Sequence, residues 1–271
     1  MNQFHFLILG NESRQLYLKE LLEQEGHIVT LSLEYIDGDY DAFLLPVPSS
    51  AKYFAMIEDK LKSGQYVFGC NLPQYNRDLL RAMQAGRAEG EVHIVEYMKS
   101  DSVAYKNAIA TAEGAIAQAI KSSDVNLHGS RSLVTGYGRC GEILAEKLKG
   151  LNSQVTIMDR KPEKRARAYA HGFQTLDFSL KNRKTIRNTS YDFVFNTVPH
   201  MVIGAEMLSC FPKEVVILDI ASRPGGVDFD YCSKNGIKAE LLPGIPGKYA
   251  PKTSAKILLE VIEESMCGSE V

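Results

Sequence analysis

The stretch that decides the fold is "SLVTGYGRCGEILAEKL", residues 132–148. A short apolar run ends in a turn with three glycines, Gly136, Gly138 and Gly141, and an amphipathic stretch follows at once. In a strand–turn–helix unit, the first glycine permits a tight turn, the second lets a pyrophosphate approach the backbone, and the third lets the helix pack on the strand. The helix N-terminus also attracts phosphates. The stretch therefore predicts a dinucleotide-binding turn, with a tight turn that binds no ligand as the alternative.

An acidic residue follows at the position where it would contact the cofactor ribose. Asp159 ends the next apolar run, 18 residues after Gly141, near the spacing of about 20 residues seen in dinucleotide-binding units. Asp159 favours NAD and repels the 2′-phosphate of NADP, whereas Arg139, Arg160 and Lys161 are placed to bind that phosphate. We therefore expect NADP as the cofactor, with NAD also accepted. For Arg160 and Lys161, a solvated helix start is the alternative.

The composition limits the class of protein. The chain has 271 residues, 45% of them hydrophobic, which suits one large domain or two of ordinary size. The net charge of −2 and the pI near 6.3 predict no attraction to nucleic acid or anionic membranes. No apolar run approaches the length of about 18 residues that spans a bilayer, and the N-terminus does not have the pattern of a signal peptide. We therefore expect a cytoplasmic protein.

The cysteines and histidines predict no metal site. Five cysteines are scattered along the chain without a C-x-x-C motif, and the six histidines are not paired with one another or with cysteine. This pattern is typical of reduced thiols in a cytoplasmic protein.

Short apolar runs alternate with helical patterns along the whole chain, which is typical of parallel sheets with helices on both faces. In the first part we expect strands at 4–10, 27–33, 40–46 and 65–70, with helices near 12–25, 51–62 and 76–86. In the second part we expect strands at 131–136, 154–159, 191–199, 215–222 and 237–244, a helix that begins at Pro162, and a last helix over 252–266.

An alanine-rich segment, 103–121, separates the two parts and predicts a linking helix. We therefore expect an α/β fold of two Rossmann-like doubly wound parallel-sheet domains joined by a long helix, with the C-terminal helix returning to the N-terminal domain. The expected boundaries are 1–102 with 252–271 for a flavodoxin- or Rossmann-like substrate-side domain, 103–126 for the linking helix, and 127–251 for the NAD(P)-binding domain. The first domain has only one glycine in its first turn, Gly10-Asn11-Glu12, and is poorly suited to a pyrophosphate.

The other strand ends carry further candidates, because ligands bind beyond the carboxyl ends of parallel strands. The sequence "NTVPH" (196–200) ends the fourth strand of the second domain with a proline-stiffened turn, which usually runs beside the nicotinamide ribose. Although His200 is a conceivable base, we interpret it as a surface histidine.

The fifth strand ends in "LDIASRPGGVD" (218–228). Arg223 is placed to point into a cleft between the domains, where its guanidinium would bind a carboxylate in a fork. We expect Gly225 and Gly226 to leave room there for the ligand. The alternative is an arginine that closes the loop by bonding backbone carbonyls. Beyond the sixth strand, Lys252 and Thr253 open the last helix and offer another anion site.

Several motifs together resemble one family. "NLHGSRSLVTGYGRCG", "FNTVP", "LDIASRPGGVDFDY" and "LLPGIPGKYAPKTSAKIL" are similar to those of the A-subunit family of dipicolinate synthases from endospore-forming bacteria, a Rossmann-type family related to D-2-hydroxyacid dehydrogenases. The resemblance extends over most of the chain, including "YKNAIATAEGAIAQAI" on the linking helix. The combination of "ASRPGG" with "PGIPGKYAPKT" is far more specific than the glycine turn.

The resemblance implies a reaction. Members of the family oxidise a dihydrodipicolinate-type intermediate of the lysine pathway to pyridine-2,6-dicarboxylate and pass a hydride to NAD(P)⁺, together with the flavoprotein-like B-subunit of dipicolinate synthase. It also implies a role in sporulation, in the cytoplasm of the mother cell. We further expect a homo-oligomer that binds a small dicarboxylate.

A substrate with two carboxylates requires cations and hydrogen-bond donors. Arg223 is the candidate catalytic residue and main substrate anchor, and the expected substrate-binding residues are Arg223, Asn107, Thr111, Lys252, Thr253 and Ser222. For Asn107 and Thr111 the alternative is a polar stripe packed between domains. Because the oxidation makes the ring aromatic, a strong base is not required.

The expected cofactor-binding residues lie at four strand ends of the second domain. They are Gly136, Tyr137, Gly138, Arg139, Cys140, Gly141, Asp159, Arg160, Asn196, Thr197, Val198, Pro199 and Ala221. At a helix N-terminus the thiol pKa of Cys140 is expected to fall, although we interpret this cysteine as a small residue in a tight turn.

Two other functions remain open. The architecture resembles the D-2-hydroxyacid dehydrogenases, in which an arginine also follows the fifth strand. However, those enzymes use a histidine in a Pro-His turn after the sixth strand, where this chain has Pro243-Gly244. The third alternative is a non-catalytic dinucleotide-binding scaffold protein.

Overall fold

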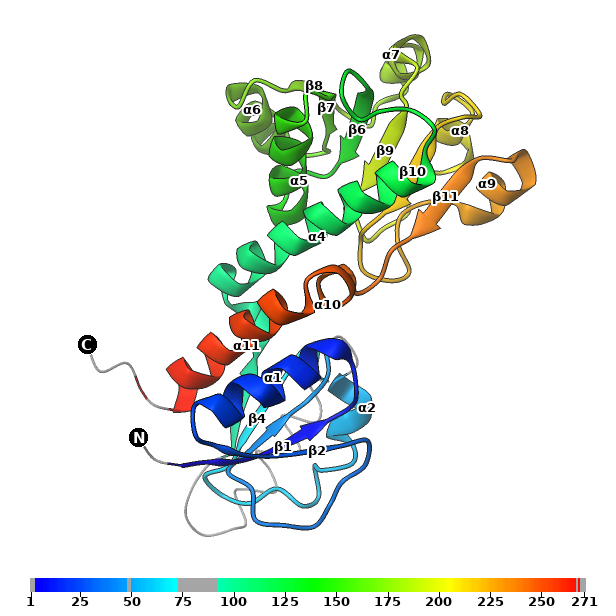
Figure 1. Cartoon of the computed structure of the whole chain (residues 1–271). Helices are drawn as coiled ribbons and strands as arrows, with labels where there is room; N and C mark the ends of the chain where they lie inside the picture. Colours follow the sequence, from blue (N-terminus) through cyan, green and yellow to red (C-terminus); the bar gives the residue numbers. More distant parts are fainter. Residues whose placement is uncertain (1–2, 48–49, 73–91, 267, 269–271) are drawn as a thin grey trace. The chain divides into compact units, whose positions relative to one another are not determined.

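The chain consists of two compact units, Met1–Asn107 with Ala250–Val271, and Ala108–Tyr249. The computed structural model of the protein describes residues 3–47, 50–72, 92–266 and 268. Each unit has a sheet whose paired strands are all parallel, with helices alongside (Figure 1), which confirms the expected fold class. Within the described ranges, no helix is long and apolar enough to cross a membrane.

The first unit is built on a five-stranded sheet in the order β2-β1-β3-β4-β5. Its strands are β1 His5–Leu9, β2 Ile28–Ser32, β3 Ala42–Leu44, β4 Tyr66–Gly69 and β5 His93–Glu96. Its helices are α1 Ser13–Gln24, α2 Ser50–Phe54, a 3₁₀ turn at Tyr97–Lys99 and α11 Pro251–Met266. This strand order is that of the flavodoxin-like folds, with a switch point between β1 and β3.

The strand β1 shows why this sheet is covered on both faces. Phe6 and Ile8 belong to one buried cluster, and Leu7 and Leu9 belong to another, because successive side chains of a strand point to opposite faces. The helices α1 and α11 contribute to the first cluster and lie side by side (Figure 1). The C-terminal helix therefore packs on the N-terminal unit, as expected.

Two expectations for the first unit were wrong. The helix expected over 51–62 ends at Phe54, because most of the following amides bond three residues back, as in Met56 N to Tyr53 O, and form successive turns. The strand β5 was not expected, since its sequence "HIVE" has only two apolar residues, Ile94 and Val95, between His93 and Glu96. The helix expected near 76–86 lies outside the described residues.

The second unit has a six-stranded sheet in the order β11-β10-β9-β6-β7-β8. Its strands are β6 Arg131–Thr135, β7 Gln154–Met158, β8 Gln174–Leu176, β9 Phe193–Asn196, β10 Val216–Asp219 and β11 Lys238–Leu241. Its helices are α5 Arg139–Gly150, α6 Pro162–Ala170, α7 Arg183–Thr189, α8 Ala205–Leu208, α9 Phe229–Asn235 and α10 Ile245–Tyr249, with a 3₁₀ turn at Leu180–Asn182.

This order is the Rossmann order, in which the chain reverses direction across the sheet between β6 and β9. The short strand β8 was not among the apolar runs identified in the sequence. As expected, Pro162 occupies the first turn of α6, where its missing N–H costs no hydrogen bond.

The helix α5 is held on the sheet by one apolar stripe. Gly141, Leu144, Ala145 and Leu148 are its buried residues, at the i, i+3, i+4, i+7 spacing of a helix face. Truncation of a fully buried leucine such as Leu144 costs about 2–5 kcal/mol. This packing directs the N-terminus of α5 to the carboxyl edge of the sheet.

The alanine-rich segment forms the long helix α4, Asp101–Ser122, and the division between the units falls within it. Gly114 marks a close approach on its second half. A Cβ there would lie 2.3 Å from Ile245 Cγ2 and 2.7 Å from Tyr249 Cδ2. Hence α10 packs directly on the α4 backbone.

Candidate functional site

Two of the three glycines in the turn between β6 and α5 are required by packing. Gly136 has φ +87°, and a Cβ there would lie 2.4 Å from Thr197 Oγ1. A Cβ on Gly141 would lie 2.1 Å from the carbonyl oxygen of Gly136. The helix therefore rests on the backbone of the turn, which only glycine permits at both positions.

Gly138 is different, because no described residue requires its lack of a side chain. Its backbone is extended, with φ −96° and ψ −167°, and it is the N-cap residue of α5. The nearest atom to a Cβ built there is Lys164 Nζ, at 3.8 Å. The space beside Gly138 faces the free amides of a helix N-terminus, which is where a phosphate binds. These residues fit a bound pyrophosphate.

The side chain of Tyr137 points away from this space. It is fully buried, and its hydroxyl lies 2.9 Å from His171 Nδ1. Burial raises the pKa of Tyr137 to about 12. Tyr137 was expected to contact the cofactor, but only its backbone lies at the turn.

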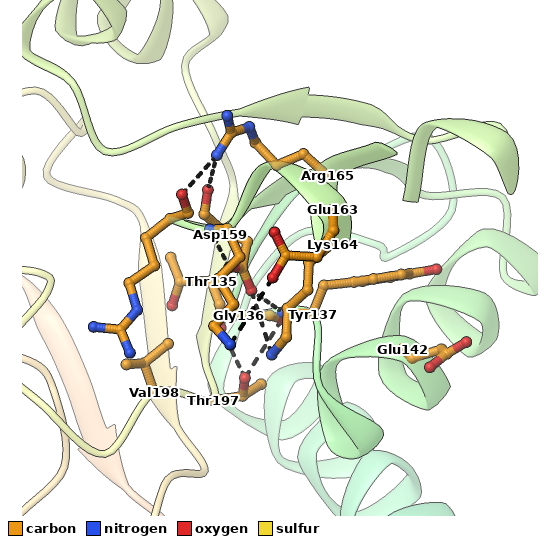
Figure 2. Close-up of polar contacts among 12 residues, drawn as sticks. Thr135, Gly136, Tyr137, Glu142, Asp159, Glu163, Lys164, Arg165, Thr197 and Val198 are labelled. Atoms are coloured by element: carbon orange, nitrogen blue, oxygen red, sulfur yellow. Dashed lines mark hydrogen bonds and ion pairs between the residues drawn. The ribbon is translucent and has the colours of Figure 1, made fainter. Parts of the chain in front are cut away.

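Asp159 closes the turn from the neighbouring strand (Figure 2). Its Oδ2 accepts the backbone N–H of Tyr137 at 2.8 Å, and its Oδ1 accepts that of Lys161 at 2.9 Å. The side chain is only 7% exposed. Asp159 therefore braces the glycine turn, and its carboxylate is largely occupied by backbone amides.

Two cations that the sequence did not single out lie beside Asp159. Lys164 Nζ is 3.9 Å from Asp159 Oδ2. Arg165 donates from Nη1 to the carbonyl oxygens of Asp159, at 2.8 Å, and Arg160, at 2.9 Å (Figure 2). Their position one turn into α6, five and six residues after a strand-end acid, was the signal that the sequence offered. The expected cations Arg139 and Arg160 are both exposed.

The expectation for the Cys140 thiol was wrong in direction. Burial raises the pKa of Cys140, and the nearby Arg139 charge only partly offsets this effect. Desolvation of the thiolate therefore outweighs the effect of the arginine charge. This direction agrees with the interpretation of Cys140 as a small residue in a tight turn.

The turn after β9 lies directly against the glycine turn. Thr197 Oγ1 donates to Thr135 O at 2.9 Å, and the Thr197 N–H donates to the same carbonyl at 3.0 Å. These bonds cross the switch point between β6 and β9, the position at which Rossmann domains bind dinucleotides. Val198 is half-buried and Pro199 exposed at the same edge.

Asn196 is completely buried, and its side chain forms hydrogen bonds to other residues of the protein. Its Oδ1 accepts from Thr135 Oγ1 at 2.7 Å, and its Nδ2 donates to Asp219 Oδ1 at 2.8 Å and to Val198 O at 2.9 Å. The amide therefore supports the turn from beneath.

Asp219 is a buried acid that the sequence analysis did not identify. Its carboxylate accepts from Ala221 N at 3.0 Å and from Gly226 N at 2.7 Å. Burial raises the pKa of Asp219, against the opposing effect of these hydrogen bonds. The signal in the sequence was an acid as the last residue of an otherwise apolar strand, followed by two glycines.

Arg223 is exposed, as is Ser222, in the loop that Asp219 closes. Among the described residues, the guanidinium of Arg223 has no hydrogen bond or ion pair. The structure therefore shows none of the carbonyl contacts that a brace of the loop would make.

The reason given for the two glycines after Arg223 was wrong. A Cβ on Gly225, which has φ +87°, would lie 2.6 Å from Asp219 Oδ2. A Cβ on Gly226 would lie 2.3 Å from His200 O and 2.5 Å from Val198 O. Both glycines are required by packing of the loop on its neighbours, not by space for a ligand.

The remaining expected residues belong to other elements. Asn107 is buried on α4, with Nδ2 3.5 Å from Met98 Sδ, and Thr111 is half-buried one turn later. Lys252 and Thr253 are exposed in the first turn of α11. The second unit by itself brings together the glycine turn, Asp159, the 196–199 turn and the 221–226 loop at one sheet edge.

Comparison with known proteins agrees with this geometry. Residues 101–230 match the NAD-binding domain of the D-isomer specific 2-hydroxyacid dehydrogenases. This range includes the glycine turn, Asp159 and Arg223. It supports an oxidoreductase-like protein that binds a nicotinamide dinucleotide.

Over its whole length, the chain is similar to a narrower group of proteins. The chain is 31% identical to the dipicolinate synthase A-subunit of Bacillus subtilis (strain 168), over 95% of this chain and 94% of the relative. The crystal structure of the dipicolinate synthase A-subunit from Bacillus halodurans matches with a TM-score of 0.83 and 29% identity, over 97% of each chain. That of the Bacillus subtilis protein matches with a TM-score of 0.80 and 27% identity, over 98% of this chain and 97% of that one. The chain belongs to the dipicolinate synthase A-subunit family.

Proposed function

We propose that this protein is the NAD(P)-dependent A-subunit of a dipicolinate synthase and oxidises a dihydrodipicolinate-type intermediate to pyridine-2,6-dicarboxylate. The similarity over nearly the full length supports this proposal, since it exceeds what a shared NAD-binding domain alone would produce. One feature of this chain carries the chemistry: Arg223 is a guanidinium without an internal partner among the described residues, at the edge that holds the glycine turn.

Arg223 would bind a substrate carboxylate through two parallel N–H bonds, a geometry that a lysine cannot reproduce. Ser222 offers a hydroxyl beside it. Fixing the carboxylate fixes the ring, and positioning supplies most of the catalysis for such a transfer. Asn107, Thr111, Lys252 and Thr253 remain further proposed contacts, because each carries a hydrogen-bond donor.

The cofactor supplies a hydride acceptor when it is bound. The amides at the start of α5, beside Gly138, would hold its pyrophosphate. Loss of hydride from the substrate makes the ring aromatic, so that a strong base on the protein is not required.

We propose NADP as the preferred cofactor, with NAD also accepted. Asp159 would normally bind the ribose hydroxyls and repel a 2′-phosphate. Here its carboxylate is 7% exposed and lies 3.9 Å from the Lys164 ammonium, which reduces that repulsion. The exposed Arg160, with Arg139 in the glycine turn, would provide the phosphate contacts.

A cavity of about 240 Å³ lies next along the sheet edge. Met158, Phe178 and Val202 are among the residues that line it. With the pyrophosphate at the end of β6 and the ribose at the end of β7, the adenine would extend in this direction. Its apolar residues suit a flat base, and Asp177, Arg183 and Glu206 also line it.

The names of its relatives imply a second subunit, and we propose that the protein acts with a flavoprotein-like B-subunit in the mother cell during sporulation. The match to 2-hydroxyacid dehydrogenases also leaves reduction of a 2-keto acid as a second candidate. It is disfavoured by Pro243-Gly244, where those enzymes carry a histidine.

The decisive experiment is a turnover assay of the purified chain with NADP⁺ or NAD⁺ and dihydrodipicolinate, run in parallel with NAD(P)H and a panel of 2-keto acids, each with and without the B-subunit. We expect reduced cofactor to form only with dihydrodipicolinate. Turnover of 2-keto acids alone would identify the dehydrogenase alternative. Cofactor binding without turnover in any arm would identify a scaffold.

A further inference from the structure

Three buried polar side chains run across the carboxyl ends of neighbouring strands in the second unit. Thr135 at the end of β6 donates to Asn196 at the end of β9, and Asn196 donates to Asp219 at the end of β10, at 2.7 and 2.8 Å. All three residues are 0% exposed. We call Thr135, Asn196 and Asp219 the strand-end relay.

One end of the relay holds the loop that carries Arg223. The two oxygens of Asp219 accept from Ala221 N at 3.0 Å and Gly226 N at 2.7 Å, on either side of Arg223. Arg223 itself has no bond to the described protein that would place its guanidinium. The Asp219 carboxylate therefore holds the loop on both sides of Arg223, and Gly226 O also accepts from Val202 N at 3.0 Å and Ile203 N at 2.9 Å.

The middle residue of the relay holds the turn beside the glycine turn. Asn196 accepts from Val198 N at 3.1 Å and donates to Val198 O at 2.9 Å. The next residue on the cofactor side, Thr197, bonds Thr135 O at 2.9 Å. A single buried amide is thus bonded to both the turn and the Asp219 carboxylate.

We propose that Asp219 is a positioning residue, which holds the Ala221–Gly226 loop and the Arg223 guanidinium in register with the Thr197–Val198 turn through Asn196. The proposal rests on the proposed function of Arg223. It identifies which buried group gives the exposed arginine a defined position relative to the cofactor turn.

The chemistry of the site requires a carboxylate. A carboxylate presents only acceptors, and here all its neighbours are N–H donors. In Asp219→Asn, the new NH₂ group would face Gly226 N–H in one orientation, or Ala221 N–H and the Asn196 amide in the other. In either orientation, a hydrogen bond from the loop is lost, because the loop N–H then faces the new NH₂ group. One side of the loop is thereby released.

The first measurement needs no assumption about substrate. Hydrogen exchange of the intact chain reports the amides of Ala221 and Gly226, which the carboxylate protects. We expect Asp219→Asn to increase the exchange of these two amides at least tenfold. Asp228→Asn is the matched control, because Asp228 caps α9 through Tyr231 N at 2.9 Å and lies outside the loop. It should alter exchange in α9 only.

The second measurement tests the link to Arg223. Titration calorimetry with pyridine-2,6-dicarboxylate in the presence of saturating NADP⁺ should show at least tenfold weaker binding for Asp219→Asn, with NADP⁺ affinity within twofold of wild type. If Asp219 acts through Arg223, the double variant with Arg223→Lys binds no worse than Arg223→Lys alone. A merely structural role would leave dicarboxylate affinity per folded protein unchanged in Asp219→Asn. Losses that add in the double variant would show that Asp219 acts independently of Arg223.

The outcomes separate the two proposals. Unchanged dicarboxylate affinity in Asp219→Asn, additive losses in the double variant, or unchanged exchange of the Ala221 and Gly226 amides would overturn the role of Asp219. Failure of the wild type to bind the dicarboxylate would instead overturn the proposed function, and the hold of Asp219 on the loop is then decided by exchange alone. If Asp219→Asn does not fold, Thr135→Val removes the first bond of the relay with little change in shape, and about threefold effects of the same pattern are expected.

Discussion

The Asp159 carboxylate accepts the backbone N–H of Tyr137 at 2.8 Å, so that the acid at the end of β7 closes the glycine turn at the end of β6. Asp159 was expected to select between NAD and NADP, and its carboxylate also stabilises the turn itself. Because the bond holds the turn in shape before any ligand arrives, the proposed pyrophosphate site at the start of α5 is preorganised.

The first prediction distinguishes the role of Gly138 from that of Gly141. Gly138→Val places a branched side chain in open space, and we expect an unchanged melting temperature but at least tenfold weaker cofactor binding, about 1.4 kcal/mol. Gly141→Ala is the matched variant, since its Cβ would lie 2.1 Å from Gly136 O, and should lower the melting temperature. Calorimetric titration and thermal unfolding measure both. Undiminished cofactor binding by Gly138→Val would remove the pyrophosphate assignment.

The second prediction concerns cofactor choice. Arg160→Ala should weaken NADP⁺ binding more than NAD⁺ binding, because only NADP⁺ carries the 2′-phosphate. Lys164→Met should also weaken NADP⁺ binding more than NAD⁺ binding. Without the lysine, the full negative charge of Asp159 would repel that phosphate. Dissociation constants for both cofactors decide this. Equal losses for the two cofactors would show that these cations do not contact the 2′-phosphate.

The third prediction concerns Arg223. Arg223→Lys should bind cofactor normally but lose on the order of 2–4 kcal/mol of transition-state stabilisation, as expected for a broken charged hydrogen bond. The loss should appear in kcat/KM for dihydrodipicolinate at an unchanged melting temperature. Arg187→Lys, at an exposed position of α7, is the control and should change neither quantity. A destabilised Arg223→Lys protein with intact kcat/KM would exclude the anchor role.

The fourth prediction concerns Cys140. Burial raises its pKa above 9.0, so the thiolate fraction near neutral pH is lower than that of an unperturbed thiol, and alkylation should be slow. The rate should continue to increase with pH beyond pH 9.0, the pKa of an unperturbed cysteine thiol. Mass spectrometry of the Cys140 peptide after timed alkylation gives the alkylation rate at each pH. The midpoint of this pH profile does not depend on how accessible the thiol is. The denatured chain serves as the reference. A midpoint below that of the denatured chain would show that the helix dipole dominates after all.

Much of the fold was predictable because it depends on local physics. Apolar runs of strand length that alternate with helical patterns predict parallel sheets, and Gly136 and Gly141 predict a tight strand–helix turn whatever surrounds them. The short strands β5 and β8 escaped prediction because their stability comes from pairing with β4 and β7, which lie elsewhere in the chain.

The candidate site was predictable only in outline. Placement of the glycine turn, Asp159 and Arg223 at strand ends follows from chain order. The roles of Gly225 and Gly226 could not be inferred, since they depend on how closely the loop approaches Asp219 and the turn after β9. Likewise, the effect of burial on the Cys140 thiol depends on atoms that only packing brings near.

The sequence by itself determined the two parallel α/β units, the glycine turn between β6 and α5 and the family, because glycine conformations, hydrophobic periodicity and motif spacing are properties of the chain. Only the tertiary structure decided which groups are already in use. It directs Tyr137 into the core, brings Lys164 to 3.9 Å from Asp159, commits Asn196 and Asp219 to the strand-end relay and gives Arg223 no internal partner among the described residues. Hydrogen bonds and desolvation act over a few ångströms in space, between residues that the sequence separates by tens of positions.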